Sequence, residues 1–105
     1  MNQDAANNRS GPRISAKVPV QIDGRDVQNQ SVQEQTETLL VNEAGALIAL
    51  ASEFQLHDRA RITNRQTSRT TDFRVAWRSA SKLNQRWSYG IALLGNPDNF
   101  WNLPK

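Results

Sequence analysis

Two arginines near the start of the chain, Arg9 and Arg13, have the residue type and the spacing to bind an anionic ligand. The three residues between them, Ser-Gly-Pro, favour a turn, and no apolar side chain among them would bury the pair. A guanidinium group is a planar fork of donors that matches phosphate, carboxylate and the edge of guanine, and it also stacks on flat rings. The pair therefore indicates contact with an anion or a nucleotide, unless the two arginines merely keep a tail in solution.

A second set of basic residues lies in the second half of the chain, where it is interleaved with aromatic residues. Its members are Arg59, Arg61, Arg65, Arg69, Arg74, Arg78, Lys82 and Arg86. Basic groups that share a face with stacking aromatics are typical of a nucleic-acid surface. In the strand predicted here, however, Phe73 and Trp77 alternate with Arg74 and Arg78, so the aromatics are predicted to face the core. Nucleic acid is therefore the less favoured partner.

Residue types that carry catalysis or bind metals are scarce in this chain. It has a single histidine, His57, and no cysteine, and no cluster of histidine and carboxylate residues has the spacing of a metal site. It also has no Gly-x-Ser-x-Gly turn and no glycine-rich phosphate loop. These features predict a non-catalytic protein with no metal and no resident cofactor.

The composition indicates one small domain. The chain has 105 residues with 13 basic and 10 acidic side chains, a net charge of +3, and a chain of this length can bury a single core without disulfides. No apolar run approaches the ~20 residues of a membrane helix, and the polar start lacks the apolar region of a secretory signal. We expect a cytoplasmic protein without membrane insertion, with residues 1–8 as a disordered tail and residues 9–105 as one domain.

The elements that would position the arginines are short β-strands. From Ile14 to Ile22 every second residue is apolar, which is the period of a half-buried strand. Similar patterns and turn signals predict six strands, at 14–22, 36–41, 46–50, 59–63, 71–77 and 87–93. Without any long helical period, this order is typical of an all-β barrel or sandwich. The residues expected to face inward are Ile14, Val18, Val20, Ile48, Ile62, Phe73, Val75, Trp77 and Ile91.

The end of the chain carries a signal for one helical turn. Asn96 is a candidate N-cap, Pro97 suits the first helical position and Asp98 suits the first turn. We expect a short C-terminal helix that lays Phe100 and Trp101 against the barrel and closes one end.

The order of these features resembles that of PilZ domains, the bacterial receptor modules for the second messenger cyclic di-GMP. The resemblance runs from Arg9 to about Trp101 and rests on the Arg-x-x-x-Arg arm followed by "NEAGALIAL", "FRVAW" and "YGIALL". It implies a six-stranded antiparallel β-barrel, which agrees with the strand count obtained from alternation. It also implies that Arg9 and Arg13 belong to an arm that wraps over cyclic di-GMP lying on the barrel.

PilZ domains carry a second motif, Asp/Asn-x-Ser-x-x-Gly, which this chain matches only in part. Aligned through Gly45, the motif falls on Leu40, Asn42 and Gly45. Leu40 lacks the polar group that can hydrogen-bond guanine, whereas the carboxamide of Asn42 has both donors and an acceptor. One lost polar contact costs about 1–3 kcal/mol, or about five- to over a hundredfold in affinity. The implied ligand contacts are thus Arg9, Arg13, Asn42 and the backbone near Gly45.

Three interpretations of function remain. The arginine pair favours a cyclic di-GMP receptor whose arm changes a contact with a partner protein when it moves. The altered second motif favours a PilZ-like adaptor that no longer binds cyclic di-GMP and acts through protein contacts alone. The third and least favoured interpretation is a nucleic-acid-binding β-barrel that uses the arginines after Asp58.

Overall fold

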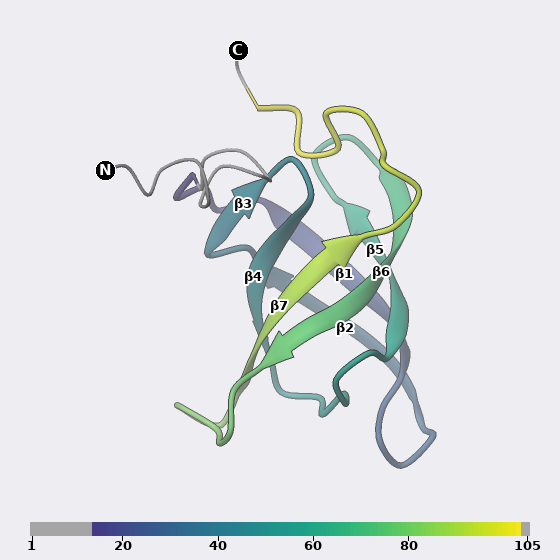
Figure 1. Ribbon diagram of the computed structural model, residues 1–105. Helices are drawn as coiled ribbons and strands as arrows, with labels where there is room; N and C mark the ends of the chain where they lie inside the picture. The colour runs from purple at the N-terminus through teal and green to yellow at the C-terminus, as the bar shows by residue number, and fades with distance from the viewer. Residues whose placement is uncertain (1–13, 104–105) are drawn as a thin grey trace, which may run out of the picture.

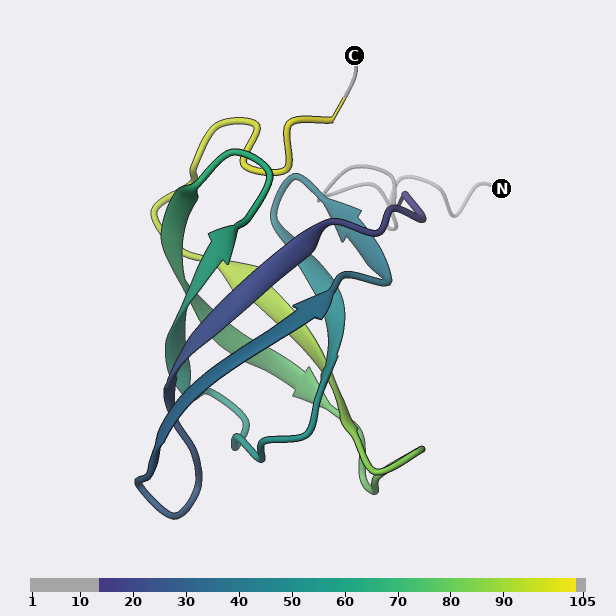
Figure 2. The same ribbon diagram turned by 180° about the vertical axis from the view of Figure 1, so that it is seen from behind.

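Seven antiparallel strands form one curled sheet, a half-barrel, in the computed structural model, which describes residues 14–103 (Figure 1). The order across the sheet is β2-β1-β5-β6-β7-β4-β3. Because the sheet curls, β7 crosses one side of the molecule while β1 and β2 cross the other (Figure 2). The strands are β1 (Pro19–Arg25), β2 (Ser31–Glu37), β3 (Leu40–Asn42), β4 (Gly45–Leu50), β5 (Arg59–Asn64), β6 (Arg69–Arg78) and β7 (Trp87–Leu93).

The predicted all-β class is confirmed, but the predicted count of six strands is wrong. The segment 36–41 is not one strand, because a corner at the buried Thr38 separates β2 from β3. The Thr38 hydroxyl accepts from the Val18 N–H at 2.9 Å and donates to the Ala16 carbonyl, which fixes the chain at this corner. β2 lies mostly in a polar stretch, and it pairs with β1 along all seven residues. Because β2 is held by backbone pairing more than by burial of apolar side chains, its sequence shows little alternation of apolar and polar residues.

The first predicted strand is shorter than expected. β1 begins at Pro19, and Ile14 forms an isolated antiparallel bridge with Val41. The Ile14 N–H donates to the Val41 carbonyl at 2.8 Å, and the Val41 N–H donates to the Ile14 carbonyl at 2.9 Å. Ile14 is 41% exposed, so its predicted place in the core is wrong. The bridge instead brings the start of the described chain alongside β3.

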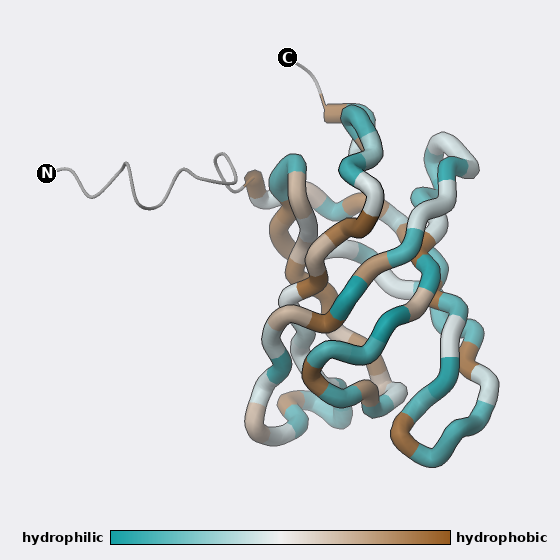
Figure 3. Tube along the Cα trace, turned by 45° about the vertical axis from the view of Figure 1, so that its right-hand side comes forward, coloured by the Kyte–Doolittle hydropathy of each residue, from teal (hydrophilic) through white to brown (hydrophobic). Residues whose placement is uncertain are grey.

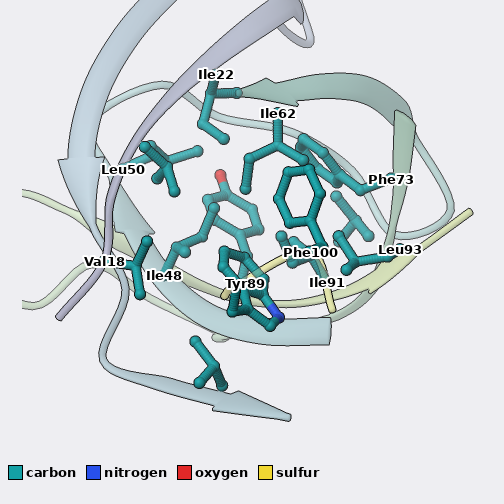
Figure 4. Packing of buried hydrophobic residues seen from close by; sticks show 14 of the residues in the cluster. Val18, Ile22, Ile48, Leu50, Ile62, Phe73, Tyr89, Ile91, Leu93 and Phe100 are labelled. Carbon is teal, nitrogen blue, oxygen red and sulfur yellow. The ribbon is translucent and has the colours of Figure 1, made fainter. Parts of the chain in front are cut away.

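The core lies inside the curl of the sheet, with Tyr89 and Phe100 near its centre (Figure 4). Hydrophobic and hydrophilic stretches succeed one another along the chain (Figure 3). Buried residues alternate with more exposed ones along β1, β7 and the middle of β6. Seven of the nine residues predicted to face inward are buried, which confirms the alternation argument for most of the sheet. They are Val18, Val20, Ile48, Ile62, Phe73, Val75 and Ile91.

Trp77 is 52% exposed, so its predicted inward position is wrong. The cause is a β-bulge in β6: Val75 lies opposite Ile91, but Trp77, two residues later, lies opposite Gly90, only one residue earlier in β7. The extra residue inverts the alternation along the rest of the strand. The indole therefore emerges on the outer face of the sheet instead of entering the core.

The phenol of Tyr89 links the core to the connection between β4 and β5. It donates to the Ser52 carbonyl at 2.7 Å and accepts from the Phe54 N–H at 2.9 Å. Burial raises the pKa of Tyr89 above its ordinary value of 10.0. The folded protein therefore keeps the phenolic proton at a pH where the unfolded chain loses it, so stability falls as pH rises above that value.

The C-terminal segment is a turn, and the predicted short helix is absent from the described residues. Asn96, Asn99 and Asn102 have φ values of 49°, 49° and 55°, in the left-handed region that interrupts a right-handed helix. The predicted burial of Phe100 and Trp101 is nevertheless confirmed, at 1% and 2% exposure. In Figure 1 this segment lies across one end of the half-barrel.

Side chains from the sheet hold that turn in place. The buried Asn64 amide donates to the Phe100 carbonyl at 2.9 Å. Arg69 donates to the carbonyls of Asp98 and Asn99 at 2.7 and 3.0 Å, and the Trp101 indole N–H donates to the Asn42 carbonyl at 2.9 Å. The bonds to the carbonyls of Asp98, Asn99 and Phe100 satisfy acceptors that a helix would have paired internally.

Candidate functional site

The predicted ligand contacts divide into two groups. Arg9 and Arg13 lie outside the described residues, so their contact with a ligand stays a prediction. Asn42 and Gly45 lie directly opposite each other at the ends of β3 and β4. Val41, the neighbour of Asn42, is the residue that bridges to Ile14. The described chain thus begins one residue pair away from the predicted site.

A groove of about 550 Å³ lies on the outer face of the sheet beside Asn42 and Gly45. Two rows of cross-strand neighbours run through this region, from β3 through β4 and β7 to β6. The first row is Leu40, Leu47, Gly90 and Trp77, and the second is Asn42, Gly45, Ala92 and Arg74. Gly90 in the first row and Gly45 and Ala92 in the second leave the floor low, while larger side chains stand at either end. The groove is therefore built into the register of four strands.

Gly45 is required here by close packing. A Cβ atom at this position would lie 1.9 Å from the Ile91 carbonyl oxygen, well inside van der Waals contact. Gly45 does not have a positive φ; among the described glycines only Gly95 does, at 79°. Gly45 lines the groove, but its direct contact with a ligand stays a prediction.

Both oxygens of Asn42 accept hydrogen bonds, and its carboxamide nitrogen has no partner among residues 14–103. Its side-chain oxygen accepts from the Ala44 N–H at 2.8 Å, which stabilises the turn between β3 and β4. Its backbone carbonyl accepts from the Trp101 indole. The carboxamide nitrogen makes no hydrogen bond within residues 14–103. Asn42 can therefore offer a donor to a ligand in the groove without breaking its turn.

Leu40 lies on the outer face of β3, where it is half-buried and lines the groove. Its neighbour Val41 points the other way and is 1% exposed. Leu40 pairs with Leu47, so this side of the groove is apolar. The sequence left the orientation of Leu40 open, and the register settles it: a substitution at this position changes the groove more than the core.

Trp77 is the groove residue that sequence reasoning missed. Alternation placed it inside, and only the bulge, a property of β6 and β7 together, brings it out beside Arg74. One signal was available in the sequence. Gly90 interrupts the strand that pairs with Trp77, and a glycine inside a strand often marks a bulge or a close approach. A Cβ on Gly90 would lie 3.4 Å from the Trp77 Cβ.

The groove combines a flat indole, apolar side walls, an amide donor and a nearby guanidinium group. Such a surface suits a planar, polar ligand better than it suits bond-breaking chemistry. Within residues 14–103 no three histidine or carboxylate side chains are placed to hold a metal ion. The same part of the chain holds no helix long and apolar enough to cross a membrane.

Comparison with known proteins gives no relative for this chain. No protein-family model, no curated protein and no solved structure matches it. The geometry of the groove and the motif resemblance in the sequence are therefore the grounds on which a function can be proposed.

Proposed function

We propose that the protein is a non-catalytic, PilZ-like barrel that binds cyclic di-GMP in the outer groove. The observation that carries this proposal is the position of the groove. A hollow flanked by Trp77 lies beside the bridge between Ile14 and Val41, next to Asn42. The Arg-x-x-x-Arg arm directly precedes Ile14 in the sequence, and Ile14 is the residue that bridges to Val41 at the edge of the groove.

Each part of the ligand has a suitable partner. The indole of Trp77 offers a face on which guanine can stack, and such stacking contributes about 1–3 kcal/mol per base. The carboxamide nitrogen of Asn42 suits the acceptor groups on the guanine edge. Arg9 and Arg13 would clamp the phosphates or stack on the second base. The volume of about 550 Å³ suits a small-molecule ligand.

Binding would act as a signal through the arm. Contacts of Arg9 and Arg13 with the ligand would hold the arm over the groove, and this would change a surface that a partner protein recognises. The protein would thus serve bacterial second-messenger signalling in the cytoplasm.

A second candidate function is a PilZ-like adaptor that binds a protein and no nucleotide. The observation in its favour is the apolar pair formed by Leu40 and Leu47 at one end of the groove. Leu40 stands where the family motif has a polar residue, so a ligand would lose one hydrogen bond there. The same pair would instead receive an apolar side chain of a partner.

Calorimetric titration with cyclic di-GMP, with cyclic di-AMP as the control ligand, tests the proposal. We expect binding to wild type, weaker binding to Arg9→Ala and Arg13→Ala, and weaker binding also to Arg13→Lys, which keeps the charge but loses the fork. Arg65→Ala is the matched control, because Arg65 is exposed in the turn after β5 and does not line the groove. No heat at high micromolar ligand would rule out the receptor function and leave the adaptor.

A further inference from the structure

We propose that the outer face of β1, β5 and β6 is a binding surface for single-stranded nucleic acid, with the phosphates along a row of arginines and a base stacked on Trp77. This function goes beyond cyclic di-GMP binding. It uses Arg25, Arg59 and Arg74, whereas the proposed nucleotide site uses Arg9 and Arg13.

The three arginines form a continuous row on the outer face. Arg59 of β5 lies directly opposite Arg74 of β6. Arg59 and Arg25 of β1 together line a shallow depression of about 430 Å³. Arg74 in turn lies opposite Ala92, which lines the groove. With strands about 4.8 Å apart, the row spans roughly 10 Å from β1 to β6 and leads directly into the groove.

These arginines do little to stabilise the fold. Neither of the two ion pairs formed within residues 14–103 involves the row, and Arg25 binds only the carbonyl of Asn29, at 3.0 Å. Like charges that face each other across two strands are destabilising, and this is the arrangement of Arg59 and Arg74. A row that costs stability suggests an anionic ligand that the molecule binds.

The neighbouring row on the same face has balanced charges. There Arg61 lies between Asp23 of β1 and Asp72 of β6, and Arg61 is 3.6 Å from Asp72. The positive charge is thus concentrated in the row that leads to the groove. This contrast also provides a matched control, because Arg61 has the same charge, strand and exposed face as Arg59.

The exposed indole of Trp77 indicates which kind of polyanion the surface can bind. Single-stranded nucleic acid is bound by basic groups that follow the backbone together with aromatic rings that stack the bases. Alternation in the sequence had separated the aromatics from the arginines, but the bulge puts Trp77 on the same face and the same strand as Arg74. A duplex keeps its bases stacked inside, so it cannot use the indole in this way.

Fluorescence anisotropy with a labelled oligothymidine of about 15 nucleotides, in about 50 mM salt, tests the proposal. We expect micromolar binding whose affinity falls with salt with a log–log slope of about −2, because each phosphate contact to a single strand contributes about −0.7. Arg59→Ala and Arg74→Ala should each weaken binding and make the slope less steep by about 0.7. The double variant Arg61→Ala, Asp72→Ala removes the ion pair of the neighbouring row without a change in net charge, so it should keep both the affinity and the slope near those of wild type.

Trp77→Ala should weaken oligothymidine binding by about 5- to 150-fold, and Trp77→Phe should restore most of the loss because it keeps an aromatic face. The proposal is overturned if no binding occurs up to roughly 100 µM protein, or if the charge-neutral double variant Arg61→Ala, Asp72→Ala weakens binding as much as Arg59→Ala. Equal affinity for a duplex of the same length would also overturn it. A polyglutamate peptide that binds as tightly, with the same dependence on Arg59 and Arg74, would overturn it in favour of an acidic protein partner.

Failure of this proposal and failure of the cyclic di-GMP proposal are distinguishable. Oligothymidine binding that depends on Arg59 and Arg74 supports the inference whether or not cyclic di-GMP produces heat in calorimetry. Cyclic di-GMP binding that depends on Arg9 and Arg13, with no oligothymidine binding, leaves the receptor function intact and removes the inference.

Discussion

Trp101 lies in the core and Trp77 lies on the outer face of the sheet, and the two show two uses of one residue type. Trp101 is 2% exposed, meets Phe100 edge-on with ring centres 5.0 Å apart, and donates to the Asn42 carbonyl. Trp77 is 52% exposed and faces the groove that Asn42 also lines. One indole is fixed by packing and a hydrogen bond, and the other remains available to a ligand. Burial therefore separates the aromatics that stabilise this fold from the one that can bind.

The largest effect that this comparison predicts is on stability. Trp101→Ala should lower the free energy of unfolding by about 3–5 kcal/mol, because it leaves a cavity beside Phe100 and removes a buried hydrogen bond. Trp77→Ala should change it by no more than about 0.5 kcal/mol, as is usual for a surface position. Chemical denaturation of both variants measures the difference. Equal losses would show that Trp77 is as important to the fold as Trp101.

The two glycines on the groove floor sharpen the comparison between packing and binding. Gly45→Ala would place a methyl group against the Ile91 carbonyl, and we expect it to destabilise the fold by about 1–3 kcal/mol. Gly90→Ala meets only the Trp77 side chain, with the Cβ at 3.4 Å, so the protein should fold with nearly wild-type stability. Gly90→Ala should instead weaken ligand binding, since the methyl group raises the groove floor. Thermal melts together with titrations measure both effects, and two variants with equal melting temperatures would contradict the packing argument.

The sequence predicted those parts of the fold in which burial alternates residue by residue. β7 was predicted with its observed bounds, and Phe73 and Val75 of β6 face inward as expected. The side chain of Trp77 was predicted on the wrong face because a bulge depends on how two strands pair. The periodicity of one strand contains no information about the strand it pairs with. β2 was placed only in part because backbone pairing, rather than an apolar face, defines most of it.

In the candidate site, too, the residues that are close in the sequence could be predicted, and those that depend on strand pairing could not. Asn42 and Gly45 could be found from the motif, since their turn is local in the sequence. The row of Arg25, Arg59 and Arg74 could not be found, because it depends on the register of three strands. Arg9 and Arg13 lie outside the described residues and stay a sequence prediction.

Repair of the second motif tests whether the groove has lost a nucleotide contact. The double variant Leu40→Asp, Asn42→Ser restores the PilZ pattern and should raise cyclic di-GMP affinity about five- to hundredfold, which is the value of one polar contact. Leu40 points away from the core, so the variant should fold, and the hydroxyl of the introduced serine can still accept from the Ala44 N–H. Calorimetry beside a melting curve measures the gain. A well-folded variant without any gain would argue against guanine at this end of the groove.

The smallest predicted effect is a gain in stability from loss of an arginine. Arg59→Thr removes one of two like charges that face each other across β5 and β6, and it introduces a residue with a higher strand propensity. We expect the free energy of unfolding to rise by a few tenths of a kcal/mol at low salt, with a smaller gain at high salt because screening already weakens the repulsion. Arg61→Thr is the control, because it gives up an exposed ion pair with Asp72 and should show no such salt-dependent gain.

If Arg59→Thr stabilises the fold while it weakens oligothymidine binding, the arginine row is maintained for binding at a cost to stability, which is the pattern expected of a functional surface. A loss of stability in Arg59→Thr would instead mean that Arg59 supports the sheet, and the argument that the row exists for a ligand would lose its main support.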